Sequence, residues 1–411
     1  MAVSLLARAG LFALDADAIP AQDKRRQQVA MAVVEGRGYS DCSSYFPLCR
    51  AGDPTATVEP APVLLYATWF GALGPTAGAY AIAATQAALG MATVALAFGL
   101  AWRLYASAAV AAGVALLYGL HPAVLRLELD FQAGALCAFF LALGVTSLLR
   151  ALETETQAWW IATGVGFGLA ALSRTAFLYF PIVVAIAVVV ERKLNGASVR
   201  WGGLATMIAS FALVLAPWAV RNYQALGAFV PGATLNGYNL YRSNHQLRDD
   251  DYLRFIGREE ADAAIAALVD AHRDQFRGGE NEVAMDDFYS HHGAEAVRAE
   301  PVRYVALSLW RLGPLLGDYG VRTMTKSRWL TFGFHAAVFV LAIAGAFRQR
   351  WWHRPPVMLL ALLVGYYFSG HMLVHAQMRY VLPLLPYLYV LAAGALMRPA
   401  ADTDGAVRSC A

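Results

Sequence analysis

The sequence predicts an all-α protein that crosses a membrane many times. Of its 411 residues, 58% are hydrophobic and only 15% are charged, and the mean hydropathy is +0.46. The apolar residues come in blocks of about 18–25, the length that a helix needs to cross roughly 30 Å of hydrocarbon. These observations predict a polytopic bundle of about 10 transmembrane helices, with short helices in its outer loops.

A first apolar block at residues 2–14 is too short to span comfortably. No small-residue cleavage site follows it, so it does not read as a signal peptide. We interpret it as the outer part of a first membrane helix. The longer blocks predict spans at residues 78–101, 105–124, 131–150, 157–173, 175–190, 201–219, 329–347, 355–373 and 379–397.

Positive charge in the short connections predicts the topology. Arg103, Arg150, the segment 191–200 and the segment 348–354 carry most of it, and they alternate regularly with the opposite helix ends. Cytoplasmic loops are rich in lysine and arginine, so these connections are expected on the cytoplasmic side. The net charge of +3 is too weak to indicate a nucleic-acid partner.

This topology gives one membrane domain, residues 1–397, with two polar excursions on the outer side and a disordered cytoplasmic tail at 398–411. The first excursion, 15–77, contains a helical stretch near 23–35 and an apolar segment, 61–73, that suits a helix lying on the membrane surface. The second, 222–302, has helical spacing and predicts a small cap.

Four cysteines constrain the fold little. Cys42 and Cys49 share the first outer loop, and they could form a disulfide in an oxidising compartment. Cys137 lies within a span and Cys410 in the tail, and both are most simply read as free.

Charged side chains gather at the outer ends of the spans, although charge near hydrocarbon is costly. Arginines there could hold a lipid-linked phosphate, and a carboxylate could take the proton from an attacking hydroxyl. Each also has a simpler reading, as a snorkelling anchor or a helix cap. The candidates are Asp23 with Lys24, Arg25 and Arg26, then Glu59, Arg126, Glu128, Asp130, Arg174, Arg221, His371, His375 and Arg379.

A divalent metal is a further possibility. His371 and His375 are spaced as two ligands on one helix would be, but no third ligand lies within sequence reach. No metal ligand is therefore assigned.

Four segments, in order, resemble bacterial membrane glycosyltransferases of the GT-C superfamily. These are family 39-like enzymes, related to dolichyl-phosphate-mannose protein mannosyltransferases and to the lipid A aminoarabinose transferase. The similar segments are EGRGYS with GDPTATVEPAP, GLAALSRTAFL, APWAVRNYQALGAFVP with GYNLYRSN, and MRYVLPLLPYLYVLAA. The resemblance runs from about residue 20 to residue 397.

The resemblance implies a GT-C-like bundle and inverting transfer of a sugar from a polyprenyl-phosphate donor at the outer face. It places the catalytic base at Asp23, with Asp15 and Asp17 as fallbacks, although QDKRRQQVA lacks the tyrosine that relatives usually show. Arg221, with Arg174 and Arg379, is expected to bind the donor phosphate. Gly134 occupies the position of a second acidic residue in relatives, which leaves Glu128 and Asp130, besides Glu59, as secondary acidic candidates.

The expected location is the cell inner membrane, with the site facing the periplasm. Membrane lipids, the lipid-linked donor and a lipid, glycan or protein acceptor are the expected partners. A transporter or lipid flippase is an alternative, but charges buried in mid-span and internal repeats would then be expected. A diverged, non-catalytic member of the family is another.

Overall fold

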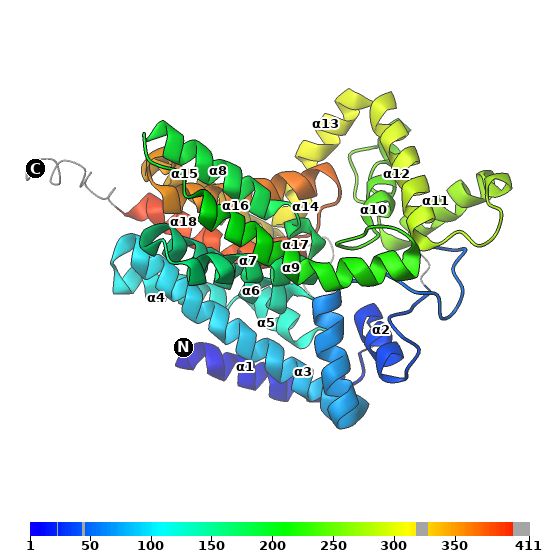
Figure 1. The fold of residues 1–411 in the computed structure, drawn as a ribbon, viewed down its shortest axis with the longest axis horizontal. Coiled ribbons are helices and arrows are strands. Elements are labelled where there is room, and N and C mark those ends of the chain that lie inside the picture. The colour runs from blue at the N-terminus through cyan, green and yellow to red at the C-terminus, as the bar shows by residue number, and fades with distance from the viewer. Residues whose placement is uncertain (23, 43–45, 318–327, 398–411) are drawn as a thin grey trace, which may run out of the picture.

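The computed structural model describes residues 1–22, 24–42, 46–317 and 328–397. Within these ranges the chain forms helices and no strand, apart from one isolated bridge between Ser40 and Pro54. Long apolar helices pack side by side as a bundle, and shorter helices gather at one end of it (Figure 1). The predicted all-α polytopic fold is confirmed. The predicted tail at 398–411 lies outside the described residues.

Seven helical segments in the described part are long and apolar enough to cross a membrane, or eight if a bent pair counts as one span. The bent pair is α4 (Ala108–Gly119) with α5 (Pro122–Leu129). Two shorter helices belong to the same bundle, α1 (Ala2–Leu14) and α7 (Gln157–Ser173). The seven are α3 (Pro60–Tyr105), α6 (Gly134–Thr154), α8 (Phe180–Leu194) with the turn before it, α9 (Trp201–Leu226), α15 (Arg328–Arg348), α16 (Pro355–Leu373), and α17 (Met378–Val381) continuing through a 3-10 turn into α18 (Leu385–Leu396).

Two helices are interrupted where the sequence carries glycine or proline. α3 breaks at Gly74, whose φ of 77° and ψ of 175° suit glycine, and Pro75 follows. The part before the break is the separate apolar helix expected at 61–73, and it stands across the end of the long part (Figure 1). The span expected at 105–124 is instead broken at His121 and bent by 51°, because Pro122 starts a new helix.

Glycines allow α7 to pack tightly between α6 and α9. A Cβ atom on Gly166 would lie 2.7 Å from the Gly144 nitrogen of α6, and one on Gly168 would lie 2.8 Å from the Val214 side chain of α9. Such close approach is possible only without side chains, so these glycines fix the end of α7, where Arg174 follows.

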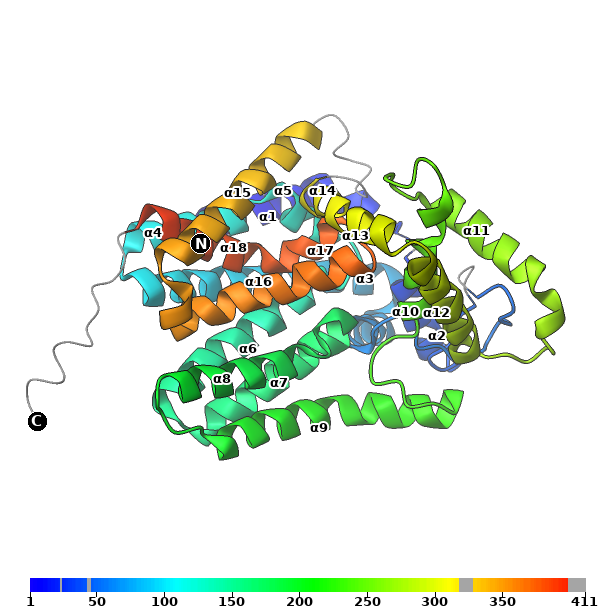
Figure 2. The same cartoon turned by 90° about the horizontal axis from the view of Figure 1, so that it is seen from above.

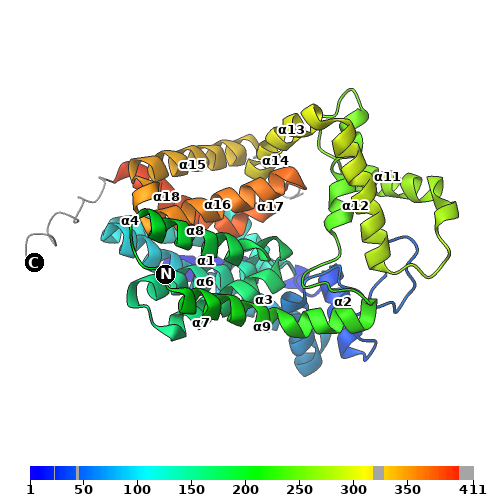
Figure 3. The same cartoon turned by 45° about the horizontal axis from the view of Figure 1, so that its top comes forward.

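The short helices and both polar excursions lie together at what we call the cap end of the bundle (Figures 1 and 3). The short connections rich in arginine and lysine lie at the opposite end, as the turn between α8 and α9 shows in Figure 2. The helices of the cap end are α2 (Arg25–Val34), α10 (Asn236–Arg242), α11 (Arg258–Ala271), α12 (Glu282–Ala299), α13 (Pro301–Trp310) and α14 (Leu312–Leu316).

The cap has a small apolar core that includes a residue of the first excursion. Phe46 packs with Tyr238, Ile265, Met285 and Tyr289. The Cys42–Cys49 disulfide, left open by the sequence, is formed in the same loop. The first loop and the cap are therefore one packed unit.

Candidate functional site

A cluster of cationic and aromatic side chains surrounds the ring of Tyr380 at the cap end. The Arg174 guanidinium carbon lies 4.7 Å from the ring centroid and that of Arg379 lies 5.5 Å away. The His371 ring stacks on the same tyrosine, with 4.5 Å between centroids. The quadrupole of the ring attracts both guanidinium groups electrostatically. With Tyr367, which contacts Arg174, these residues are called the Tyr380 cluster below.

Hydrogen-bond donors of the Tyr380 cluster are left unused by the protein. Arg174 is 9% exposed, and one of its Nη atoms donates to the Tyr367 hydroxyl at 3.4 Å. The Nε atoms of Arg174 and Arg379 are buried and have no partner among the described residues. Buried donors are normally satisfied, so two orphaned guanidinium N–H groups in one place indicate a site for an anion.

A second group, the loop cluster, lies where α2 meets the start of α3. Arg26 forms an ion pair with Glu59 and donates to the Gln132 side chain at 3.3 Å. Lys24 pairs with Asp130 at 3.2 Å, with both side chains more than a third exposed. Glu59 and Asp130, two of the secondary acidic candidates, therefore share this cluster.

Electrostatics link the loop cluster with the Tyr380 cluster. Burial alone would raise the pKa of the Glu59 carboxyl, but the positive charges of Arg26 and Arg174 hold that pKa below its usual range. Burial likewise opposes the charge of Arg26, and Glu59 raises the pKa of Arg26 above its ordinary value. Glu59 is thus ionised and paired, which suits an orienting carboxylate better than a proton acceptor.

Arg221 has its donors engaged by the protein backbone. Its guanidinium donates to the carbonyl oxygens of Tyr39 at 2.6 Å and Thr55 at 2.7 Å, and to the Asn222 side chain at 2.9 Å. It also lies 5.2 Å from the Trp218 ring centroid. These contacts tie the end of α9 to the first loop. Its phosphate-binding role stays a prediction, and few donors are left for it.

Glu128 is placed inside the bundle rather than at the loop cluster. Its carboxylate, 2% exposed, pairs with Arg8 at 2.6 Å. Arg8 also donates to the Gly119 carbonyl at 3.0 Å, which joins α1 to the α4–α5 break. Removing one partner of a buried pair leaves an uncompensated charge, so Glu128 here stabilises the position of the first helix.

Asp23 lies outside the described residues, so its role as base stays a prediction. The same described ranges contain no group of three or more histidine, cysteine, aspartate or glutamate side chains that could hold a metal. His375 has both ring nitrogens engaged, with Ser243 at 2.9 Å and Gln377 at 3.0 Å. The rings of His371 and His375, one helical turn apart, therefore make separate hydrogen bonds.

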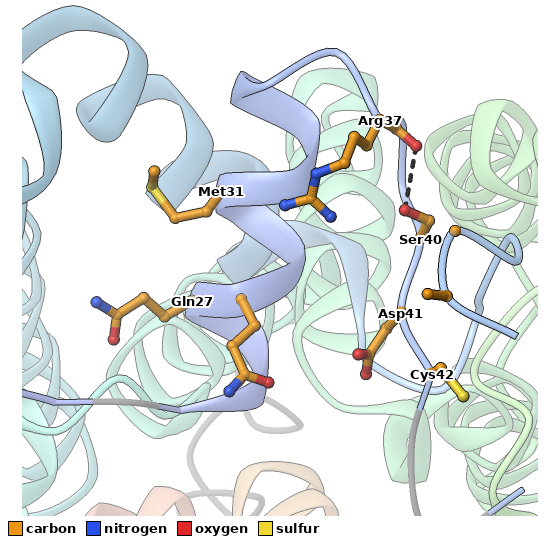
Figure 4. A pocket seen from close by; sticks show the side chains of 9 residues that line it. Gln27, Met31, Arg37, Ser40, Asp41 and Cys42 are labelled. Atoms are coloured by element: carbon orange, nitrogen blue, oxygen red, sulfur yellow. Dashed lines mark hydrogen bonds between the residues drawn. The ribbon is translucent and has the colours of Figure 1, made fainter. Parts of the chain in front are cut away.

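A pocket of about 470 Å³ opens between α2 and the segment that follows it (Figure 4). Gln27 and Met31 line it from α2, and Arg37, Ser40 and Asp41 line it from the segment (Figure 4). A second pocket of about 220 Å³ includes Asp41 in its lining and continues toward the cap. Amide, hydroxyl and carboxylate groups of this kind bind molecules rich in hydroxyl groups.

The sequence model of the dolichyl-phosphate-mannose-protein mannosyltransferase family matches residues 59–218. The matched stretch begins at Glu59, includes Arg174 and ends at Trp218, so it contains parts of both clusters. Over this stretch the chain is similar to that family. The resemblance predicted from the motifs is thereby confirmed for residues 59–218. No curated protein sequence matches the chain.

Solved structures with some likeness to this chain include ArnT from Cupriavidus metallidurans bound to undecaprenyl phosphate. It is 14% identical, with a TM-score of 0.41, and the match covers 96% of this chain and 76% of ArnT. The archaeal oligosaccharyltransferase AglB from Archaeoglobus fulgidus, in complex with an inhibitory peptide and a dolichol-phosphate, is 15% identical, with a TM-score of 0.49. That match covers 90% of this chain and 46% of AglB, so the chain spans less than half the length of AglB.

Several residues of the two clusters were not assigned roles from the sequence. Tyr380 follows Arg379 directly in the MRYVLPLLP motif, and Tyr367 precedes His371 by one helical turn. That turn places Tyr367 and His371 on one face of α16, and this spacing was the available signal. Arg26 was among the outer-face charges, but its pairing with Glu59 spans 33 residues and no local pattern marks it.

Proposed function

We propose that the chain is an inverting glycosyltransferase that moves a sugar from a polyprenyl-phosphate donor to an acceptor. The family match supports glycosyl transfer as the class of reaction. The gathering of polar groups at the cap end supports a reaction at one membrane face. We place that face at the periplasm of the inner membrane, since the arginine-rich connections lie at the opposite end.

The donor phosphate binds the Tyr380 cluster in this proposal. The observation that carries it is the pair of buried, unpartnered Nε atoms on Arg174 and Arg379, both beside one aromatic ring. Guanidinium groups match phosphate oxygens in geometry and charge. As the bond between the anomeric carbon and the phosphate oxygen breaks, negative charge grows on the phosphate. Arg174 and Arg379 would stabilise that charge in a setting with little water.

The acceptor binds on the loop-cluster side, and the pocket beside α2 supports a hydroxyl-rich acceptor. Asp23 is proposed as the base that takes the proton of the acceptor hydroxyl. Glu59, held ionised by Arg26, positions α2 against the start of α3. Asp130 and Glu128 are not needed as bases, because each pairs with a cation.

Mass spectrometry of cells with and without the gene tests this function. Loss of the chain should cause one polyprenyl-phosphate sugar to accumulate and one glycan modification to disappear. Wild-type protein should restore both, and Asp23→Asn should restore neither at equal membrane abundance. Unchanged lipid-linked sugars and glycans in the deletion strain would contradict the proposed sugar transfer. Full restoration by Asp23→Asn would show that another residue is the base.

A further inference from the structure

His371 has one ring nitrogen engaged and one free. Its Nδ1 lies 3.0 Å from the backbone oxygen of His375, one helical turn further along. A carbonyl oxygen only accepts, so Nδ1 carries the hydrogen. In the neutral ring Nε2 therefore presents a lone pair, and this buried atom has no partner within the described ranges. His375, by contrast, has both ring nitrogens engaged.

Among the described residues, the charged group that acts on His371 is the cation Arg174. Arg174 faces it from the end of α7, and its own helix contributes Tyr367, with ring centroids 4.4 Å apart. Tyr380 and Arg379 come from α17, and His375 follows α16. A second positive charge on the imidazole beside Arg174 is costly unless an anion is present. His371 is therefore neutral until an anion enters the Tyr380 cluster.

We propose that His371 shares one proton with the phosphate monoester formed when the sugar leaves, and thereby distinguishes the spent lipid from the donor. The proposal rests on the donor phosphate binding the Tyr380 cluster. It assigns His371 to the leaving-group side of the reaction. Arg174 and Arg379 neutralise charge there, while the Nε2 lone pair responds to the number of protons on the phosphate.

The acceptor oxygen forms a bond to the anomeric carbon, and its proton goes to the base. The bond from that carbon to the phosphate oxygen breaks, and the electron pair stays on the oxygen, which turns the diester monoanion into a monoester dianion. One proton from solvent then lies between that oxygen and Nε2, and the base releases its proton to solvent.

The donor and the spent lipid differ in whether the phosphate group can bind a proton near neutral pH. A phosphodiester such as the donor carries one negative charge and binds no proton near neutrality, whereas a phosphate monoester has a second pKa of about 6. Binding of the monoester to the neutral His371 ring therefore takes up a proton at alkaline pH. Binding of the diester takes up none, so the affinities for the two lipids should respond differently to pH.

Binding measurements on the full chain in lipid nanodiscs test this inference. The ligands are undecaprenyl phosphate and its methyl diester, between about pH 7 and 9. The affinity for the monoester should fall roughly tenfold for each pH unit, as one-proton linkage requires, while that for the diester stays flat. Calorimetry in buffers of different ionisation enthalpy should show about one proton taken up with the monoester and none with the diester.

His371→Gln should abolish the pH dependence, because a glutamine amide can donate to the phosphate without gaining a proton. His291→Gln, at an exposed cap histidine, is the matched control and should keep it. Equal pH profiles for the two lipids in wild-type protein, or an unchanged slope in His371→Gln, would overturn the inference. Failure of the wild-type chain to bind either lipid would instead overturn the proposed donor site itself.

Discussion

Arg221 lies near the end of α9 and Arg174 directly follows the neighbouring α7, yet the two differ in what their guanidinium groups contact. Arg221 donates to two backbone carbonyl oxygens and a neighbouring side chain. Arg174 makes one long hydrogen bond, to Tyr367, and keeps a buried N–H without a partner in the described chain. The first arginine is occupied in holding the protein together, and the second is available to a ligand.

The unused hydrogen-bond donors of an arginine therefore indicate a ligand-binding role better than the motif that contains the arginine. Arg221 lies in APWAVRNYQALGAFVP, the stretch most similar to the family pattern, whereas Arg174 lies in a shorter and weaker match. An arginine whose donors already bind carbonyl groups must break those bonds to hold a phosphate. We therefore expect Arg174 to affect transfer and Arg221 to affect stability.

The largest effect is expected from Arg174→Gln. Loss of one positioned donor to a developing oxyanion costs about 100- to 1,000-fold in rate, so kcat/KM for sugar transfer should fall by that order. Steady-state transfer with purified protein measures this, and the melting temperature serves as a check on folding. Arg273→Gln, at an exposed cap arginine, is the control and should be unaffected. Wild-type rates in Arg174→Gln would place the phosphate elsewhere.

A smaller loss is expected from Arg379→Gln. Arg379 is only partly buried and lies further from the Tyr380 ring than Arg174 does. A hydrogen bond to a charged group contributes about 1.5–3 kcal/mol, and exposure to water places this one at the lower end, or roughly tenfold in kcat/KM. The same assay measures it, with Arg379→Lys as the variant that retains charge. A loss greater than that of Arg174→Gln would reverse the order of the two arginines.

Arg221→Lys should lower stability with little change in transfer by the folded protein. A lysine cannot reach both the Tyr39 and Thr55 carbonyl oxygens. The Tyr39 carbonyl would still accept from the Thr55 backbone N–H, but the Thr55 carbonyl would lose its donor, and a buried carbonyl left unpaired costs about 1–3 kcal/mol. Thermal unfolding in detergent should show a lower melting temperature, and the KM for the donor should stay within about threefold of wild type. A raised KM at unchanged melting temperature would instead indicate that Arg221 binds the donor phosphate.

The smallest effect concerns Glu282, which binds the first loop to the cap. Its carboxylate accepts from the Thr55 and Thr234 hydroxyls at 2.8 and 2.7 Å, and burial raises its pKa above the ordinary 4.5 although these bonds oppose the shift. The folded protein thus keeps this proton to higher pH than the unfolded chain. Its contribution to stability should fall as pH rises above about 4.5 and then level off.

Glu282→Gln removes this titration and keeps one acceptor oxygen, which can serve the Thr234 hydroxyl while the Thr55 hydroxyl accepts from the amide N–H. The melting temperature of wild type, relative to that of Glu282→Gln, should therefore decline as pH rises from about 4.5 toward neutrality. A difference that grows with pH would contradict the raised pKa.

Apolar length and charge placement were sufficient to predict the bundle and its two ends. Helix-length apolar blocks and arginine-rich turns are local patterns, so one sequence carries them. The break at His121 was missed because residues 105–124 are mostly apolar and read as one span, and the effect of Pro122 on the preceding residue was not weighed.

The partners of the candidate residues could not be predicted, because they come from distant parts of the chain. Tyr39 and Thr55, which occupy Arg221, lie 182 and 166 residues away from it. Arg8, which occupies Glu128, lies 120 residues away. Sequence alone showed which charges share a membrane face, and only the packed fold shows which of them are already paired.

Equilibrium binding of undecaprenyl phosphate to wild type, Arg174→Gln and Arg221→Gln, at one pH in nanodiscs, compares the two arginines in one experiment. If the Tyr380 cluster holds the phosphate, Arg174→Gln should weaken binding by about 100-fold or more, and folded Arg221→Gln should bind within about threefold of wild type. The reverse order, with binding lost in Arg221→Gln and kept in Arg174→Gln, would show that the phosphate binds at Arg221 and not at the Tyr380 cluster.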